Sequence, residues 1–545
     1  MTHLRIAAAV GLAVALSAPP PRAAAQPARP PSLVVILVVD QMRADYIDRM
    51  RPHWTQGLER LVSGGAVFEQ NAYPYLQTVT CAGHATIGTG SFPATHGIIL
   101  NAWWRGTRSA TCTDDATVRS VPYEPGAETI GHSAKELRVP TLADRLREHS
   151  PTSRVVTLST KPRSAIMLAG HAGLVTWLDD RNIWATSSAF SQAPDPGVQA
   201  FVSAHPRSAL RDVVWTLPAE RDHYSGPDDG VGEAAPLGWT ATFPHPLAGA
   251  PGTPPGQFDT LWETSPYSDE YLGAMAAFLV ERMKLGQRDA VDFLGVSFSA
   301  LDHVGHAFGP DSLEVQDTLL RLDATVGRLL EAIDRSVGRD RYVLGLSADH
   351  GAAPVPEGRQ HAGLEAGRLS TAVLAQVANE ALVRTLGPGT HVARIEYTQL
   401  YLTADANARA TQDPHVLDDT VEALSRVPGV ERVVRGAGLE RQRDATDPAV
   451  RAAALSHVPG RSGQLVVIPK DYWLVGAATA RGTTHGTYHQ YDARVPLVFY
   501  GAGIKPGRYA DPSTPADLAP TLAEVIGMTM PGADGHPRTA ALIGR

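Results

Sequence analysis

Short runs of apolar, mostly β-branched residues, each next to charged or imidazole side chains, constrain the fold of this chain most. The clearest is Leu33 to Val39, LVVILVV, which Asp40 follows. A run that is apolar throughout is typical of a strand buried on both faces, as in a parallel sheet. We predict four further buried strands: Arg154 to Thr160, Val291 to Ser299, Arg341 to Leu346 and Val495 to Tyr500.

Helical patterns separate the predicted strands. Between Leu313 and Ile333, apolar residues recur near a 3.6-residue period. Such alternation predicts an α/β fold, in which helices cover both faces of a mostly parallel sheet. Ligands of these sheets bind beyond the carboxyl ends of the strands. Four charged residues lie just past such ends: Asp40, Lys161, Asp302 and Asp349.

Two segments interrupt this alternation. Residues 192–256 are rich in Pro and Gly with little periodicity, so we expect them to wrap the surface or cover the site. Residues 391–470 hold a strand (RIEYTQLYL), a helix and two more strands, which predict a small inserted α+β subdomain. The main domain would then consist of residues 33–390 and 471–545.

The N-terminus has the pattern of a secretory signal. Arg5 precedes an apolar run from Ile6 to Ala18, and three alanines end a predicted signal peptide of residues 1–25. The run is too short to span a bilayer, and no later stretch qualifies. We therefore expect an exported protein, periplasmic or secreted, without a membrane span, whose residues 26–32 are a linker.

Composition and charge narrow the functional classes. The 545 residues are 43% hydrophobic and 19% charged, which allows a large core. Without residues 1–25, which carry two arginines and no acid, the formal charge moves from −8 to −10. A negative net charge argues against nucleic acid as the main partner. A local cluster of positive charge can still bind phosphate.

Cys81 and Cys112 are the two cysteines of the chain. In an oxidising compartment we predict that they form a disulfide. The alternative is a small buried Cys81 and an unrelated Cys112.

The stretch from Tyr73 to Trp104 delivers Thr80 to the start of a Gly/Ala-rich helix that runs to about Gly90. We predict Thr80 as the N-cap of that helix. Free N–H groups and the positive dipole end would make the position suitable for an anion such as phosphate. The alternative is that Thr80 only caps the helix.

Acids and histidines gather near the predicted strand ends. Asp302 and His306 are four apart and would share one face of a helical turn. His350 directly follows Asp349, and His485 lies in a Gly/Thr loop before another strand. Each could simply cap a turn or bond to backbone. Together with Asp40 they form a set of three Asp and three His, which favours zinc over magnesium.

In this order the motifs resemble the alkaline phosphatase superfamily over nearly the whole mature chain. The resemblance is closest to its secreted, phosphate-irrepressible monoesterase branch, which is similar in its core to the nucleotide pyrophosphatase/phosphodiesterases. Thr80 and His84 match the T-x-x-x-H pattern of this branch. Asn101 matches its phosphate-binding asparagine, and Ser159 to Arg163 matches its S-x-K-x-R motif.

The resemblance implies two zinc ions per chain and Thr80 as the nucleophile. One zinc would be held by Asp40, Thr80, Asp349 and His350, and the other by Asp302, His306 and His485. Asn101, Lys161 and Arg163 would bind the substrate. Since the family spacing H-G-x-x-x-x-Y-D ends here at Tyr491-Asp492, it favours His485 over His489 as the ligand.

These features predict an alkaline phosphatase acting on small-molecule phosphate monoesters, with a monomer favoured. We expect Pro162 to keep the segment extended, so that Lys161 and Arg163 point the same way toward phosphate oxygens. The alternative is a phosphodiesterase or nucleotide pyrophosphatase, although the Lys–Arg pair suits a dianion better. A sulfatase would need a C-x-P-x-R or S-x-P-x-R motif, which residues 81–84 lack. A non-catalytic binding protein should have lost a ligand or the nucleophile.

Overall fold

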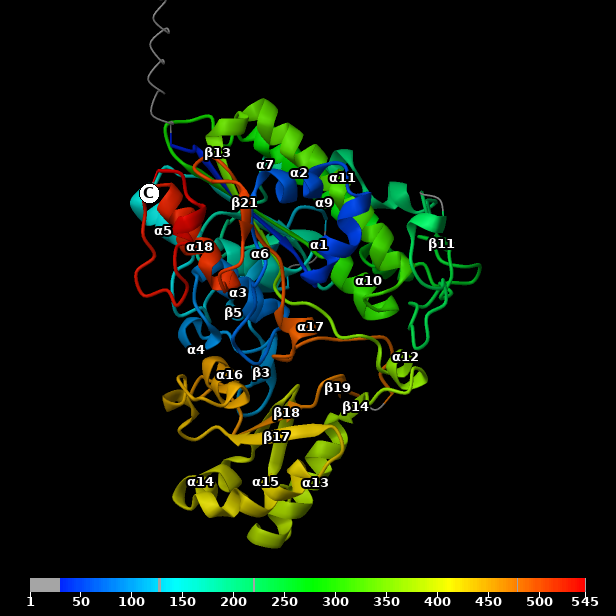
Figure 1. The fold of residues 1–545 in the computed structure, drawn as a ribbon, viewed down its shortest axis with the longest axis vertical. Helices are drawn as coiled ribbons and strands as arrows, with labels where there is room; N and C mark the ends of the chain where they lie inside the picture. Colours follow the sequence, from blue (N-terminus) through cyan, green and yellow to red (C-terminus); the bar gives the residue numbers. More distant parts are fainter. Residues whose placement is uncertain (1–29, 126–128, 219–220, 478, 545) are drawn as a thin grey trace, which may run out of the picture.

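The computed structural model describes residues 30–544, apart from 126–128, 219–220 and 478. The predicted signal peptide and the first part of the linker lie outside this range. Within it, an 11-stranded sheet runs through the larger part of the molecule (Figure 1). Its five central strands are parallel, in the order β13 (Tyr342–Ser347), β1 (Leu33–Val39), β12 (Asp292–Phe298), β7 (Val155–Ser159) and β8 (Leu174–Leu178).

The margins of the sheet are mainly antiparallel, so the sheet as a whole is mixed. Next to β13 lie β20 (Leu497–Gly501), β2 (Ala66–Phe68) and β21 (Gly507–Tyr509). Next to β8 lie β9 (Trp184–Ser187), β5 (Asp114–Pro122) and β6 (Ile130–His132). The predicted strand 495–500 is β20, and it runs antiparallel to β13. Four of the five predicted strands therefore belong to the parallel centre and the fifth to the margin.

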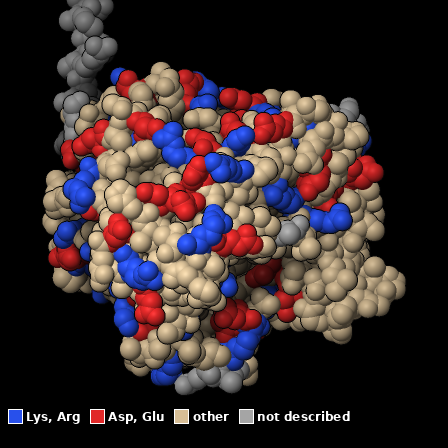
Figure 2. All heavy atoms as spheres, turned by 90° about the horizontal axis from the view of Figure 1, so that it is seen from below, with Lys and Arg blue, Asp and Glu red and all other residues tan. Residues whose placement is uncertain are grey.

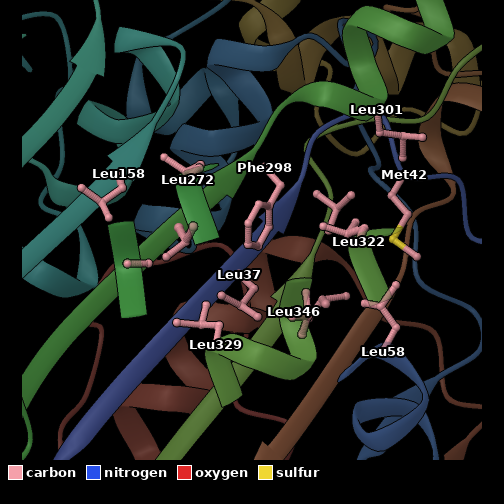
Figure 3. Close-up of a cluster of buried hydrophobic side chains, with 14 of the residues drawn as sticks. Leu37, Met42, Leu58, Leu158, Leu272, Phe298, Leu301, Leu322, Leu329 and Leu346 are labelled. Atoms are coloured by element: carbon pink, nitrogen blue, oxygen red, sulfur yellow. The ribbon is translucent and has the colours of Figure 1, made fainter. Parts of the chain in front are cut away.

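Helices cover both faces of the sheet, as the uninterrupted apolar strands require. Leu33, Val35 and Leu37 of β1 face one cluster, and Val34 and Ile36 face the other. The first cluster is closed by α2 (Gly57–Gly64), α9 (Pro266–Arg282), α10 (Ala300–Phe308) and α11 (Leu313–Ser336), and Figure 3 shows part of it. The second is closed by α3 (Thr80–Thr89), α5 (Leu142–His149), α6 (Pro162–Ala169) and α18 (Leu518–Val525).

The Pro/Gly-rich segment lies against α11. After α7 (Pro196–Ala204) it contains only short regular elements among its described residues. Trp215 Nε1 and the Tyr224 hydroxyl donate to the two oxygens of Asp317, at 2.6 and 2.9 Å. His245 Nε2 lies 2.9 Å from Glu314 Oε1. These buried polar contacts fix an otherwise irregular segment to the surface of the main domain.

The inserted region forms a separate small sheet below the main one in Figure 1. Its antiparallel strands are β15 (Val392–Glu396), β16 (Gln399–Leu402), β18 (Leu465–Pro469) and β17 (Val430–Arg435). The segment RIEYTQLYL is thus not one strand but a hairpin, which turns at Tyr397 with φ of 53°. Leu374 and Leu382 of α13 (Thr371–Leu386) pack into the same core, so this preceding helix joins the subdomain.

Figure 2 views the molecule from the subdomain end, where Lys and Arg are interspersed with Asp and Glu. This mixture agrees with the modest net charge. No helix in the part of the chain that the structure describes is both long and apolar enough to cross a bilayer.

Candidate active site

The strand order brings four charged residues to one edge of the sheet. Asp349, Asp40, Asp302 and Lys161 follow β13, β1, β12 and β7, which are adjacent in that order. Parallel neighbours end at the same edge, so residues up to 309 positions apart in sequence converge there. The converging side chains come from strand ends, as the sequence predicts.

His485 reaches this edge by a different route. It lies in the loop before β20, and because β20 is antiparallel to β13, its beginning meets the end of β13. Asp492 Oδ2 holds the loop by accepting hydrogen bonds from the Gly486 and Thr487 N–H groups, at 3.0 and 2.8 Å. The acid of the H-G-x-x-x-x-Y-D spacing therefore fixes the loop that carries the histidine.

Two groups of side chains could each hold a metal ion. Asp40, Asp349 and His350 form the first, with ligand atoms all within 4.8 Å of one another. His350 Nε2 lies 3.4 Å from both Asp40 Oδ1 and Asp349 Oδ2. Thr80 Oγ1 is 3.3 Å from the same nitrogen. The structure thus brings together the four residues that the resemblance assigns to one zinc.

The second group surrounds Asp302. His306 Nε2 lies 3.1 Å from Asp302 Oδ1, and His485 Nε2 lies 3.9 Å from the same oxygen. By geometry His350 also belongs here, because it forms a group with Asp302 and His485 and its ring stacks on His485 at 3.3 Å. The predicted set of Asp302, His306 and His485 is therefore contiguous, and His350 adjoins both groups.

The three candidate histidine ligands are oriented in the same way. Each Nδ1 lies 2.8–2.9 Å from a backbone carbonyl oxygen: Thr483 for His306, Gly351 for His350 and Thr78 for His485. A carbonyl only accepts, so Nδ1 carries a proton, and in the neutral ring Nε2 keeps its lone pair. This is how metal-binding imidazoles are held in proteins.

The electrostatics of the site suit a cation. Asp40 Oδ1 is buried and accepts no hydrogen bond from a described residue. Burial and the nearby charge of Asp40 raise the pKa of Asp349 to about 7. Burial lowers the pKa of His350 to about 3, which keeps its ring neutral. For His306, burial opposes the charged form, yet the Asp302 carboxylate raises its pKa. Imidazoles beside crowded carboxylates are a donor set that suits a divalent metal, so the residues present fit an ion such as zinc.

Thr80 is the first residue of α3, not its N-cap. Val79 occupies the cap position in extended conformation and Thr80 already has helical geometry, so the capping prediction is wrong. Its hydroxyl instead faces His350, and the side chain is buried. The helix approaches the site closely because Gly83 has no side chain. A Cβ there would lie 2.2 Å from the Asp349 carbonyl oxygen.

Asn101 accepts hydrogen bonds from the backbone N–H groups of both cysteines. Cys81 and Cys112 form the predicted disulfide. The Cys81 N–H donates to Asn101 Oδ1 at 2.8 Å, and the Cys112 N–H donates to the Asn101 carbonyl at 2.9 Å. With Oδ1 engaged, the Nδ2 group is the part of this side chain left to donate to a ligand.

Lys161 lies between both acidic groups. Its Nζ is 2.6 Å from Asp40 Oδ2 and 2.5 Å from Asp302 Oδ2. Burial opposes the charged form, yet the two carboxylates raise the pKa of Lys161. Lys161 is extended as predicted, but α6 begins at Pro162 and Arg163 is helical, so the prediction of an extended segment through Arg163 is wrong. Arg163 Nε is buried and has no hydrogen-bond partner among the described residues.

A cavity of about 320 Å³ opens beside these groups. Its lining consists of Val79, Leu100, Asn101, Ala102, His306, Glu396, Tyr397, Thr484 and His485. Glu396 and Tyr397 come from the inserted subdomain, whereas none of the lining comes from residues 192–256. A larger cavity of about 730 Å³, beside Tyr472 and Arg494, contains none of the predicted ligands. The smaller cavity is therefore the one of these two that the candidate ligands His306 and His485 line.

Sequence reasoning left three contributing residues without a role. His84 Nδ1 lies 3.2 Å from Asp349 Oδ2, and the T-x-x-x-H pattern could have indicated it. The Tyr397 hydroxyl donates to the backbone carbonyl of His485 at 2.7 Å. Gln41 Nε2 donates to Asp302 Oδ1, also at 2.7 Å. No sequence signal marks these two, because both depend on long-range contacts.

An α/β sheet with this site at its carboxyl edge places the chain among the phosphoric ester hydrolases of the alkaline phosphatase superfamily, and two groups of its side chains could hold metal ions. Residues 34–492 match the family "Type I phosphodiesterase / nucleotide pyrophosphatase". The chain belongs to this family.

Named relatives match nearly the whole chain. A protein of Myroides odoratus named calcium-transporting ATPase is 31% identical over 94% of this chain and 95% of its own length. The alkaline phosphatase PafA of Elizabethkingia meningoseptica is 32% identical with the same coverage.

Crystal structures of alkaline phosphatase PafA superpose with TM-scores of 0.86 for the wild type and 0.87 for a mutant. Both are 30% identical and cover 94% of this chain and 99% of theirs. The mutant is altered at one threonine, one asparagine, one lysine and one arginine.

Proposed function

We propose that this protein is an exported two-zinc alkaline phosphatase that hydrolyses small-molecule phosphate monoesters through a phosphothreonine intermediate. The observation that carries the proposal is the position of Thr80 Oγ1. It lies at the positive end of α3 and 3.3 Å from His350 Nε2, at the first acid–imidazole group. The signal-like N-terminus supports export.

The ligand assignment follows from the grouping of the side chains. One zinc would be held by Asp40, Asp349, His350 and Thr80, and the other by Asp302, His306 and His485. Three carboxylates partly neutralise two divalent ions and leave net positive charge for a phosphate dianion. Bound zinc would lower the pKa of the coordinated hydroxyl and of a water molecule and would withdraw charge from phosphate oxygens.

Thr80 performs the first displacement. Its Oγ1 forms a bond to phosphorus while the ester P–O bond breaks, and the alcohol leaves with a proton. Water then attacks the phosphothreonine, which releases inorganic phosphate and returns the proton to Thr80. The burial of Thr80 and its fixed helical backbone hold the oxygen at one position for both steps.

Three side chains would bind the transferred group. Asn101 presents Nδ2 beside the cavity, and Lys161 and Arg163 supply positive charge. Charge on a transferring phosphoryl group spreads over its three non-bridging oxygens, so several donors are useful at once. In the mutant of the related phosphatase, the altered threonine and asparagine are as far apart in sequence as Thr80 and Asn101. The altered lysine and arginine are two apart, as Lys161 and Arg163 are.

A phosphodiesterase is the second candidate, because the matched family is named for that reaction. The same two ligand groups would serve it. Lys161 and Arg163 favour the monoester, since a diester has one charge fewer and an esterified oxygen where a donor would bind.

The two candidates are separated by steady-state kinetics on one metal-analysed preparation. An aryl phosphate, a bis-aryl phosphate and an aryl sulfate with the same leaving group would be compared by kcat/KM. We expect the monoester to react fastest by several orders of magnitude. A diester that reacts as fast as the monoester would overturn the proposal in favour of the second candidate.

A further inference from the structure

Gln41 connects the two acidic groups of the site through its own atoms. Its backbone N–H donates to Asp349 Oδ1 at 3.1 Å. Its side-chain Nε2 donates to Asp302 Oδ1 at 2.7 Å and lies 3.4 Å from the Asp302 carbonyl oxygen. One residue therefore contacts a carboxylate from each candidate metal group.

The conformation of Gln41 shows that the surroundings hold it in place. Its φ is 68°, in the left-handed region that is unfavourable for a non-glycine residue. The side chain is 1% exposed and fills the space over Gly305, where a Cβ would lie 1.9 Å from Gln41 Oε1. A strained, buried residue whose backbone N–H and side-chain Nε2 both donate to carboxylates of the site indicates a role that offsets the strain.

The contact from Gln41 helps to set how the Asp302 carboxylate is turned. Asp302 Oδ1 receives Gln41 Nε2 and lies 3.1 Å from His306 Nε2, whereas Oδ2 meets Lys161. Without the amide donor, the carboxylate could rotate about its side-chain bond and present Oδ1 away from His306 and His485. Hydrogen bonds that orient ligands in this way typically contribute 10–100-fold to metal affinity.

We infer that Gln41 is a positioning residue that turns Asp302 toward the second zinc site and ties its placement to that of Asp349. The inference rests on the proposed two-zinc function. The side chain of Gln41 acts on the Asp302 site only. The contact to Asp349 is made by the backbone N–H of Gln41, so it remains when the side chain is replaced.

The test is a zinc titration of chelator-treated full-length protein, read with a competing chromophoric chelator. Gln41→Met keeps side-chain length and the unfavourable φ but has no donor. Gln41→Gly also removes the donor, but glycine adopts the positive φ without strain. It therefore still tests the donor if Gln41→Met folds poorly. Gln77→Met is the matched control, because the Gln77 side chain is equally buried and donates to Thr398, away from the acids.

Wild type and Gln77→Met should each bind two zinc ions per chain. At each of the two sites, the zinc affinity of Gln77→Met should equal that of the wild type. Gln41→Met and Gln41→Gly should each keep one site unchanged and lose about 10–100-fold affinity at the other. Cobalt-substituted Gln41→Met should show an altered visible absorption spectrum, which a packing change remote from the metals would not cause.

Two results would overturn the inference. If Gln41→Met binds both zinc ions as tightly as wild type, the amide does not position Asp302. If wild type itself binds fewer than two zinc ions, the two-zinc function fails and the inference fails with it. The first result leaves the proposed function standing, so the two failures are distinguishable.

Discussion

The hydroxyl of Tyr397 donates a 2.7 Å hydrogen bond to the backbone carbonyl of His485. Tyr397 lies at the turn of the β15–β16 hairpin, and its ring packs on Gly486, where a Cβ would come within 2.8 Å. A residue of the inserted subdomain thus holds the loop that carries a candidate metal ligand. The subdomain contributes to the site by contact as well as by lining the cavity.

Tyr397→Phe should therefore weaken the site as well as the fold. Loss of this bond should cost about 1 kcal/mol in the free energy of unfolding. Zinc affinity should fall about tenfold, because the His485 loop loses its support. Tyr401→Phe is the control, since its hydroxyl makes a similar 2.9 Å bond to the Arg461 carbonyl in the same subdomain. Equal zinc affinity in the two variants, measured by titration, would show that the loop does not need Tyr397.

Removal of metal should abolish turnover. Dialysis against a strong chelator is expected to eliminate monoester hydrolysis and lower Tm, because the positive charge of Lys161 alone then faces three buried carboxylates. Readdition of two zinc equivalents should restore both. Activity assays and thermal melts, paired with elemental analysis, check this. A fully demetallated enzyme that keeps its activity would exclude the two-metal mechanism.

Thr80→Ala should lose several orders of magnitude in kcat/KM, because no other hydroxyl takes the place of Oγ1 at the start of α3. Thr80→Ser keeps the oxygen and should retain substantial activity. Zinc content of both variants, measured beside the kinetics, separates a lost nucleophile from a lost ligand. An unimpaired Thr80→Ala enzyme would falsify the phosphothreonine step.

Lys161 and Arg163 should differ in their effects on monoester and diester hydrolysis. Arg163→Ala should cut monoester kcat/KM by about 10²–10³, the typical cost of about 2–4 kcal/mol for such a contact. Its diester activity should fall much less. Lys161→Ala should lower both activities, because its ammonium also touches Asp40 and Asp302. Rates on both esters test this, and a proportional loss in Arg163→Ala would assign Arg163 to the fold.

The disulfide should stabilise the fold and hold Asn101. Replacing both cysteines by serine should lower the free energy of unfolding by roughly 3–4 kcal/mol, the chain-entropy value for a 31-residue separation. Denaturant titration measures it. Monoester kcat/KM should fall too, since the two N–H groups that bind Asn101 belong to the bridged residues. Two free thiols in denatured, unreduced wild type would contradict the bridge.

The sequence by itself located the buried strands at the centre of the sheet and pointed to the candidate ligands. A strand buried on both faces must be apolar throughout, so Leu33–Val39 is recognisable from composition alone. A charged residue directly after such a run has to lie at the strand's end, which located Asp40. The helical pattern from Leu313 to Ile333 was equally evident, because periodicity is a local property, and it belongs to the 24-residue helix Leu313–Ser336.

Only the tertiary structure decided which strands are neighbours and in which direction they run. β1 pairs with β12 and β13, more than 250 residues away, and β20 turns antiparallel, which brings His485 to the same edge as Asp349. The hairpin at Tyr397 and the left-handed Gln41 are likewise set by contacts across the fold. Local propensity disfavours that conformation at Gln41, and the partners that stabilise it are assembled only when the sheet forms.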